Sequence, residues 1–344
     1  MNKMKYIKTT EAEGHVLCHD ITKIVPGKFK GAAFKKGHIV KKEDIEELLR
    51  LGKEHLYVWE NDETVMHEDE GAYALAKLCL GEKISVKGKP KEGKIEVIAD
   101  MDGLLKVDDF RLRKVNSIGE MIIASRHGNF PVKKGDVIAA MRVIPLVIKR
   151  KKIEDAKAVC GDKPLFDIME FKHKNAAVIV TGSEVAKGRI EDSFGPVVEA
   201  KLAEYGVDVI EKSIVADDTK IIAEAVCKAA ENGARLILCT GGMSVDPDDR
   251  TPGAIRSLGA DILTYGAPVL PGAMFLLAYY EFNGQKIPVM GLPGCVMYAR
   301  RTVFDLMLPR VIADDKPDNI ADYGEGGLCL NCNVCTFPKC GFGK

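Results

Sequence analysis

Residues 176–184 read Ala-Ala-Val-Ile-Val-Thr-Gly-Ser-Glu. An unbroken apolar run that gives way at once to Thr, Gly and Ser is typical of a strand buried on both faces and ended by a tight turn. Strand-like and helix-like segments then alternate along the chain as far as residue 312. This alternation predicts an α/β domain with a doubly wound, mostly parallel sheet.

The later elements of this domain follow from their patterns of apolar residues. Strands are expected at 207–215, 235–239 and 287–290, and helices at 194–206, 219–233 and 296–308. Asn283-Gly284, between two apolar runs, predicts a hairpin turn. Pro309 is expected to end the last helix.

The sequence changes character along its length, which predicts four regions. Gly and Lys separate short alternating segments over 84–148, a rhythm typical of a small β domain. The α/β domain is therefore expected to follow a mainly β accessory region. The predicted boundaries are 1–82 for an α+β region, 83–150 for the β domain, 170–314 for the α/β domain and 325–344 for a Cys-rich tail.

Charge and hydropathy narrow the classes of partner. The 344 residues carry 50 Lys and Arg against 50 Asp and Glu, so no net charge attracts nucleic acid or an anionic membrane. The first ten residues lack an apolar core, and no apolar run is long enough to span a membrane. We expect a cytoplasmic homodimer that recognises a small molecule.

Polar residues follow each predicted strand, where open α/β sheets bind ligands. Gly241-Gly242 lets backbone N–H groups approach a phosphate, and the carboxylates suit ribose or pterin N–H donors, or Mg²⁺. The candidate residues are Thr181, Gly182, Glu184, Asp192, Asp218, Thr240, Gly241, Gly242, Ser244, Asp246, Asp248, Asp249, Thr251, Pro271, Gly272, Pro293 and Gly294.

The order of these motifs, from Thr181-Gly-Ser-Glu184 through Thr240-Gly-Gly-Met-Ser244 to Leu292-Pro-Gly294, resembles a known family over about residues 172–312. It is the molybdopterin-binding domain shared by molybdopterin molybdenumtransferases and molybdopterin adenylyltransferases. The resemblance implies that molybdopterin or its adenylylated form binds with Mg²⁺. It implies that Gly241, Gly242 and Ser244 hold the phosphate, and that Glu184, Asp218 and Asp249 handle metal or molybdate in catalysis.

Departures from the transferase pattern leave three functions open. The chain has Leu270 before Pro-Gly, where the transferases have Lys, and Cys295-Val296 after Leu-Pro-Gly, where they have Asn-Pro. Asp246-Pro-Asp-Asp-Arg-Thr251 is more similar to the adenylyltransferases and to the competence-damage-inducible family. The alternatives are a transferase of molybdenum cofactor biosynthesis that inserts metal or moves a nucleotidyl group, a non-catalytic molybdopterin carrier or sensor, and a pyridine-nucleotide salvage enzyme.

The tail carries the spacing Cys329-x2-Cys332-x2-Cys335-x4-Cys340. Four thiols so close together, among Asn, Gly and Pro, favour a metal site over disulfides in a chain without a secretion signal. The spacing of its first three cysteines resembles the ferredoxin pattern and favours a [4Fe–4S] cluster. Structural Zn²⁺ is the alternative. Through this tail a molybdoenzyme or maturation protein is a possible partner.

Overall fold

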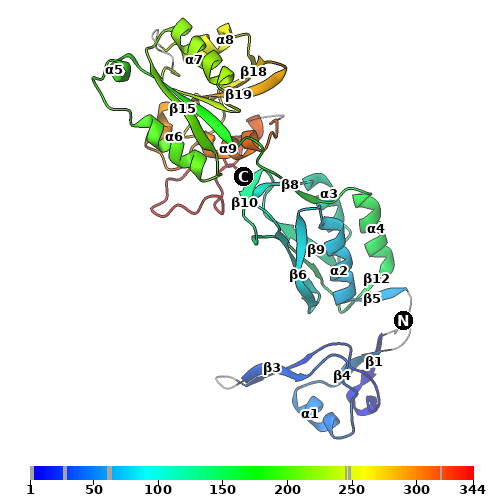
Figure 1. The fold of residues 1–344 in the computed structure, drawn as a ribbon. Helices are drawn as coiled ribbons and strands as arrows, with labels where there is room; N and C mark the ends of the chain where they lie inside the picture. The colour runs from blue at the N-terminus through cyan, green and yellow to red at the C-terminus, as the bar shows by residue number, and fades with distance from the viewer. Residues whose placement is uncertain (1–3, 26–28, 60–63, 245, 247–248, 318–319) are drawn as a thin grey trace. The chain divides into compact units, whose positions relative to one another are not determined.

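The computed structural model describes residues 4–344 except 26–28, 60–63, 245, 247–248 and 318–319. The chain forms two compact units, which are coloured along the sequence in Figure 1. Unit 1 comprises Met1–Asp100, Val107–Arg126 and Lys134–Asp167, and unit 2 comprises Met101–Lys106, His127–Lys133 and Ile168–Lys344. Within the described ranges, no helix has the length and apolar character needed to cross a bilayer.

Unit 2 is built on a six-stranded sheet with the order β15-β14-β16-β19-β18-β17. Its strands are β14 (Asn175–Thr181), β15 (Asp208–Val215), β16 (Ile237–Thr240), β17 (Asp261–Tyr265), β18 (Leu276–Phe282) and β19 (Gln285–Leu292). The first four in this order run parallel, and β18 and β17 extend the sheet as antiparallel strands. The predicted mostly parallel sheet is confirmed.

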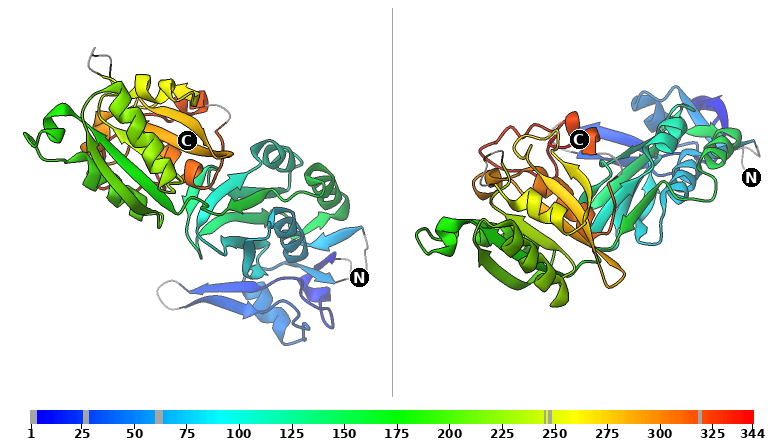
Figure 2. Two further views of the ribbon diagram at one scale, coloured as in Figure 1. Left: turned by 45° about the horizontal axis from the view of Figure 1, so that its top comes forward. Right: turned by 90° about the horizontal axis from the view of Figure 1, so that it is seen from above.

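Helices cover both faces of this sheet, as Figure 2 shows. Successive side chains of a strand point to opposite faces, so Leu238 of β16 joins one core while Ile237 and Cys239 join another. The helices α6 (Phe194–Ala203) and α9 (Val303–Ile312) contribute to the first core, and α7 (Thr219–Glu231) and α8 (Thr251–Ser257) contribute to the second. The sheet is therefore doubly wound, as predicted.

The predicted end of the last helix is wrong, because Pro309 lies inside α9. The chain first makes a 3-10 turn, η2 (Gly294–Met297), and α9 begins after Thr302, which forms a capping box with Asp305. All residues of α9 are buried. This packing outweighs the backbone hydrogen bond that a proline cannot donate.

The hairpin predicted at Asn283-Gly284 joins β18 and β19. Phe282 lies opposite Gln285, and Asn283 and Gly284 have φ angles of 49° and 75°. A type I′ turn needs a positive φ at both central residues. The prediction is confirmed, and the hairpin adds β18 to the sheet beside β19.

Unit 2 also contains most of the residues of a three-stranded sheet with the order β10-β8-β13. Its strands are β8 (Gly103–Val107), β10 (Phe130–Val132) and β13 (Phe166–Met169). Leu104 and Phe130 of these strands pack in the same core as Phe342 near the C-terminus. Two short segments from the predicted 83–150 region therefore complete the core around α9 and the tail.

The N-terminal part of unit 1 is a small α+β structure. The strand β1 (Met4–Lys8) pairs with β4 (His55–Trp59), and β2 (Ile21–Val25) pairs with β3 (Phe29–Phe34). With α1 (Asp44–Arg50) they surround a core that includes Leu17, Leu48 and Val58.

The remainder of unit 1 contains an antiparallel sheet with the order β6-β7-β11-β9. Its elements are β6 (Ile84–Lys91), β7 (Lys94–Ala99), β9 (Met121–Ser125) and β11 (Val137–Val143), the pair β5 (Val65–His67) and β12 (Val147–Lys149), and the helices α2 (Glu68–Cys79), α3 (Asp109–Asn116) and α4 (Arg150–Cys160). The helix α2 packs on β7 and β11, and α3 packs on β9.

Candidate functional site

The carboxyl ends of the parallel strands meet in one row at a single edge of the six-stranded sheet, here called the ligand edge. The strand register fixes this arrangement, since Thr181 lies opposite Val215, Val180 opposite Thr240, Thr240 opposite Leu292, and Gly291 opposite Leu276. The loops after β14, β15, β16 and β19, and the turn before β18, therefore start side by side. Residues as far apart in the sequence as Val180 and Leu292 come together here.

Gly241 and Gly242 form a tight turn directly after β16. Their φ angles are 85° and 55°, a region that favours glycine. A Cβ atom on Gly241 would clash with the carbonyl oxygen of Thr181 on the neighbouring strand. Thr251 holds the turn from the other side, since its hydroxyl donates to Gly241 O at 2.9 Å and its amide to Gly242 O at 3.2 Å. Both glycines are thus required by geometry.

Thr240, the last residue of β16, carries a buried hydroxyl. Its side chain has no exposed surface, and its Oγ1 has no hydrogen-bond partner among the described residues. Side chains alternate along the strand, so Thr240 points to the same face as Leu238, toward the core of α6 and α9. A buried hydroxyl without a partner is unusual in a folded protein and is available to a ligand that reaches it.

The loop after the glycine turn is acidic and held by a tyrosine. The Asp246 amide donates to Asp249 Oδ2 at 3.1 Å, and the Asp249 amide donates to Asp246 O at 2.9 Å. The hydroxyl of Tyr265, at the end of β17, donates to Met243 O at 3.1 Å. Burial and the nearby Asp249 carboxylate raise the pKa of Tyr265. The sequence did not single out Tyr265, and Asp248 lies outside the described residues.

The loops after β14 and β15 are joined by a reciprocal pair of hydrogen bonds. The Ser183 amide donates to Asp217 Oδ2 at 2.7 Å, and the Asp217 amide donates to Ser183 Oγ at 3.4 Å. Glu184 is exposed in the adjacent short helix α5 (Ser183–Ala186). Asp218 instead accepts hydrogen bonds from the amides of Lys220 and Ile221 and caps α7. Asp217 is therefore the aspartate that bridges the two strand ends.

Asp192 has a structural partner at each oxygen. Its Oδ1 accepts hydrogen bonds from the amides of Phe194 and Gly195, both at 2.9 Å, and its Oδ2 pairs with Lys212 Nζ at 2.8 Å. Burial raises the pKa of Asp192, but the hydrogen bonds from Gly195, Lys212 and Phe194 outweigh that effect, so its pKa lies below the usual 3.8. These contacts give Asp192 the role of a cap for α6.

Two Pro-Gly turns complete the ligand edge. Gly272, with φ 129°, is packed so closely that a Cβ atom there would lie 2.5 Å from Val303 Cγ1. Pro293 is buried and leads into η2, whereas Gly294 is exposed with open space around its Cα. The first turn is fixed by packing against α9, and the second leaves its backbone open to solvent.

A buried ion-pair network fixes the segment that follows η2. Lys201 Nζ contacts Asp305 Oδ1 at 2.6 Å and also donates to the carbonyl oxygen of Arg300 at 3.0 Å. Arg301 bridges Asp305 to Glu204, at 2.7 and 3.0 Å. Arg301 and Asp305 form a local i,i+4 pair, whereas the contacts of Lys201 with Asp305 and of Glu204 with Arg301 join segments about 100 residues apart and follow from no local pattern.

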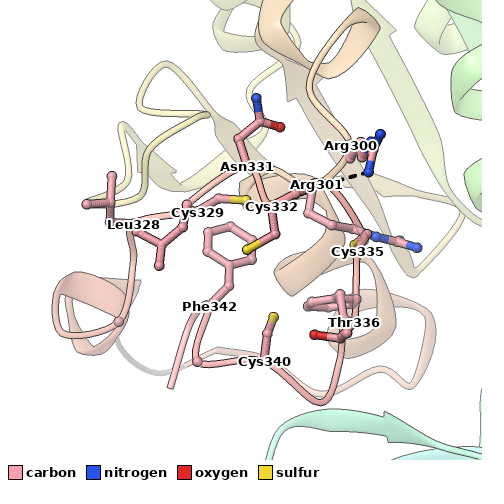
Figure 3. A pocket seen from close by; sticks show the side chains of 14 residues that line it. Arg300, Arg301, Leu328, Cys329, Asn331, Cys332, Cys335, Thr336, Cys340 and Phe342 are labelled. Atoms are coloured by element: carbon pink, nitrogen blue, oxygen red, sulfur yellow. Dashed lines mark hydrogen bonds between the residues drawn. The ribbon is translucent and has the colours of Figure 1, made fainter.

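The tail cysteines Cys329, Cys332, Cys335 and Cys340 are free thiols that line one cavity of about 230 Å³ in unit 2. Figure 3 shows their side chains around a shared space beside Phe342. In the described part of the chain, no three Cys, His, Asp or Glu side chains are placed so that they could hold one metal ion. The tail thus gathers the four thiols without presenting a ready site for a single ion.

The ligand edge defines an α/β domain that offers glycine turns, hydroxyls and carboxylates at the carboxyl ends of parallel strands, where such domains bind their ligands. Residues 177–313 match the family described as a probable molybdopterin binding domain. Residues 6–60 match a second family, described as a domain of unknown function.

Curated relatives match only part of the chain. A molybdenum cofactor biosynthesis bifunctional protein of Synechococcus elongatus is 39% identical over 85 residues, which are 25% of this chain and 27% of that protein. A protein of Bacillus cytotoxicus described as competence-damage inducible is 28% identical over 130 residues, 38% of this chain and 31% of that protein. The chain therefore spans about a third or less of the length of these relatives.

Two solved structures are similar to part of this chain. The tungsten cofactor synthesizing protein MoaB from Pyrococcus furiosus is 20% identical, with 42% of this chain and 98% of that chain covered and a TM-score of 0.35. The protein CinA from Thermoplasma acidophilum is 23% identical, with 40% and 98% covered and a TM-score of 0.33.

Proposed function

We propose that this protein binds the phosphate or nucleotide end of a molybdopterin at the ligand edge and serves molybdenum cofactor biosynthesis or maturation. The observation that carries the proposal is the Gly241-Gly242 turn in the row of strand ends, within the segment 177–313 that matches the molybdopterin-binding family. Backbone N–H groups of such a turn suit an oxyanion. The domain relatives in cofactor biosynthesis support the same ligand.

The residues of the ligand edge have different roles in this proposal. Gly241, Gly242 and Ser244 bind the phosphate, and the buried Thr240 hydroxyl, which has no partner among the described residues, supplies a further hydrogen bond. Thr181 and Thr251 hold the turn in place from its two sides, with their hydroxyl oxygens 3.4 Å apart. The ligand therefore meets a surface whose backbone is set before it arrives.

Mg²⁺ enters this proposal as a companion of the ligand's phosphates. Such ions keep several waters and use one or two carboxylates together with substrate phosphates. Asp246 is exposed and Asp249 half-buried in one loop, and Glu184 is exposed after β14. These carboxylates fit that mode, in which the ion neutralises phosphate charge.

The residues that depart from the transferase pattern favour binding and delivery over metal insertion. Leu270 and Cys295 replace a cationic side chain and an amide, so fewer groups are available to hold molybdate. Leu270 is 58% exposed, and its backbone is bonded to the cysteine tail. We therefore propose that the protein acts primarily as a carrier or sensor of molybdopterin. Turnover of molybdopterin by the purified protein would instead indicate a transferase.

The relatives described as competence-damage inducible favour a second candidate, a pyridine-nucleotide salvage enzyme. Their match covers a larger part of this chain than the cyanobacterial relative does. Molybdopterin and a pyridine nucleotide both carry a phosphate, so the glycine turn is compatible with both candidate functions. The two ligands differ in their ring systems.

Calorimetric titration of the anaerobically purified full chain tests the proposal. Molybdopterin, its adenylylated form and nicotinamide mononucleotide are titrated separately, with and without Mg²⁺. We expect binding of a molybdopterin form and none of nicotinamide mononucleotide. Binding of the latter alone would favour the salvage enzyme, and binding of none of them would reject the ligand edge as a site. Light scattering on the same sample measures the homodimer that we expect.

A further inference from the structure

The C-terminal segment from Leu328 to Lys344, here called the cysteine segment, wraps around a cavity although it contains no helix or strand. Leu330 and Val334 are 78% and 75% exposed, so this segment does not bury a core of its own. Phe342 is buried in the core around α9, and Cys329, Phe337 and Cys340 pack against that core while only partly buried. An irregular segment that leaves apolar side chains in water needs another source of stability.

Backbone contacts fix the segment around its cavity. The Cys329 amide donates to Leu270 O at 2.9 Å, and the Leu270 amide donates to Gly327 O at 2.7 Å. The Arg300 guanidinium donates to Asn333 O at 2.6 Å and to Cys332 O at 3.2 Å. The side-chain sulfurs, by contrast, are free thiols. These hydrogen bonds thus fix the backbone of the segment, and its four sulfurs remain available to bind a metal.

The arrangement fits a polynuclear cluster better than one zinc ion. Zinc draws four thiolates to about 2.3 Å from a single centre, which sets the sulfurs roughly 4 Å apart. The described residues contain no such group, while the four thiols line a cavity of about 230 Å³. A four-iron cluster binds each thiolate through a different iron, so its ligands stand farther apart and the metal-sulfide core fills the space between them.

The charge of the cavity supports an anionic occupant. Arg300 and Arg301 line it, Arg301 being paired with Asp305 and Glu204, and no carboxylate is among the lining residues. The Arg301 guanidinium also lies 4.9 Å from the centroid of the Phe337 ring, which keeps it at the wall. A cluster bound by four thiolates carries net negative charge, and nearby cations stabilise it.

We propose that Cys329, Cys332, Cys335 and Cys340 bind a [4Fe–4S] cluster whose presence orders the ligand edge. Each thiol releases its proton, and each thiolate binds one iron. The cluster is linked to the edge at two points. The Cys329 amide donates a hydrogen bond to the carbonyl oxygen of Leu270, next to the Pro271-Gly272 turn. The Arg300 guanidinium, which follows η2, donates a hydrogen bond to the carbonyl oxygen of Cys332. The significance of this link for molybdopterin rests on the proposed function, but the cluster itself does not.

Iron, sulfide and zinc analysis of the full chain, purified without oxygen and reconstituted with iron and sulfide, tests the cluster. We expect about four irons and four sulfides per chain. Cys332→Ser should lose them, while Cys227→Ser, in α7 outside the segment, should keep them. Both cysteines are replaced by serine, and Cys332 is exposed, so circular dichroism can verify that the fold is retained. One zinc without sulfide, no bound metal, or full iron in Cys332→Ser would overturn the proposal.

Hydrogen exchange without any pterin tests the link to the ligand edge. Peptides covering residues 268–276 and 294–302 should exchange at least about tenfold faster in Cys332→Ser than in Cys227→Ser. Equal exchange in the two variants would overturn the ordering role. Because no pterin is added, these outcomes are separate from the calorimetric test. A chain that holds the cluster and binds no molybdopterin rejects the proposed function only.

Discussion

The Ser183 amide donates a hydrogen bond to the Asp217 carboxylate over 2.7 Å and thereby joins the ends of β14 and β15. The next residue, Asp218, faces its own helix α7 instead. Two adjacent aspartates therefore have different roles, one in the alignment of two ligand-edge loops and one in the start of a helix.

This difference is testable by paired alanine variants. Asp218→Ala should lower the free energy of unfolding by about 1 kcal/mol, because α7 loses its N-cap, and should leave molybdopterin affinity unchanged. Asp217→Ala should weaken affinity, because the loop after β14 loses its anchor. Urea unfolding and calorimetry measure both effects. Loss of affinity with unchanged stability in Asp218→Ala would give Asp218 the site role that the sequence predicted.

Gly241→Ala should impair both folding and binding. The new Cβ would meet the Thr181 carbonyl, and its positive φ is unfavourable for alanine, so we expect a loss of about 2 to 4 kcal/mol in unfolding free energy. Gly253→Ala is the matched control, since α8 leaves open space there, and it should be neutral or stabilise by up to about 1 kcal/mol. Equal melting temperatures for both variants would contradict the packing of the turn.

Thr240→Val separates a ligand contact from a structural one. Because Thr240 Oγ1 has no partner in the described structure, its loss should leave the unfolding free energy unchanged or raise it by about 1 kcal/mol, while affinity falls. Thr251→Val, which removes the bond to Gly241 O, should cost about 1 to 2 kcal/mol. Urea titrations with and without ligand measure both. Clear destabilisation by Thr240→Val would show that its hydroxyl has a structural role.

The ionised Asp192 should make stability depend on pH on the acid side. Its pKa is lower in the folded protein than the usual 3.8, so its contribution is present above that pH and is lost as the pH falls through the folded value. Asp192→Asn keeps an oxygen for the amides of Phe194 and Gly195 but loses the charge that pairs with Lys212. The variant should show a shallower fall in unfolding free energy between pH 5 and pH 3, by urea titration. Identical slopes would contradict the lowered pKa.

Much of unit 2 could be predicted from the sequence because its strands are buried on both faces and its helices carry clear caps and stops. The run 176–180 and the Asn283-Gly284 turn specify local structure directly. Pro309 misled the prediction because tertiary burial of α9 outweighs a local signal. The contribution of Leu104 and Phe130 to unit 2 depends on contacts more than 150 residues apart in the chain, which no periodicity reveals.

The site was predictable as a set of loops, but not the role of each side chain. The alternation of strands and helices predicts parallel strands whose carboxyl ends share one edge, so the convergence of Thr181, Thr240 and Leu292 could be expected. Whether an aspartate joins two loops of the ligand edge or caps a helix depends on one residue of offset, as Asp217 and Asp218 show. Tyr265 escaped notice because its hydroxyl reaches the loop from the far strand β17.

Hydrogen exchange of the full chain with and without saturating molybdopterin tests the central claim most directly. The ligand should slow exchange in peptides covering residues 181–184 and 240–252, at the ligand edge, and should leave exchange in the hairpin at 282–285 unchanged. Saturation of the protein with no protection in either of the first two peptides would contradict the placement of the ligand at this edge.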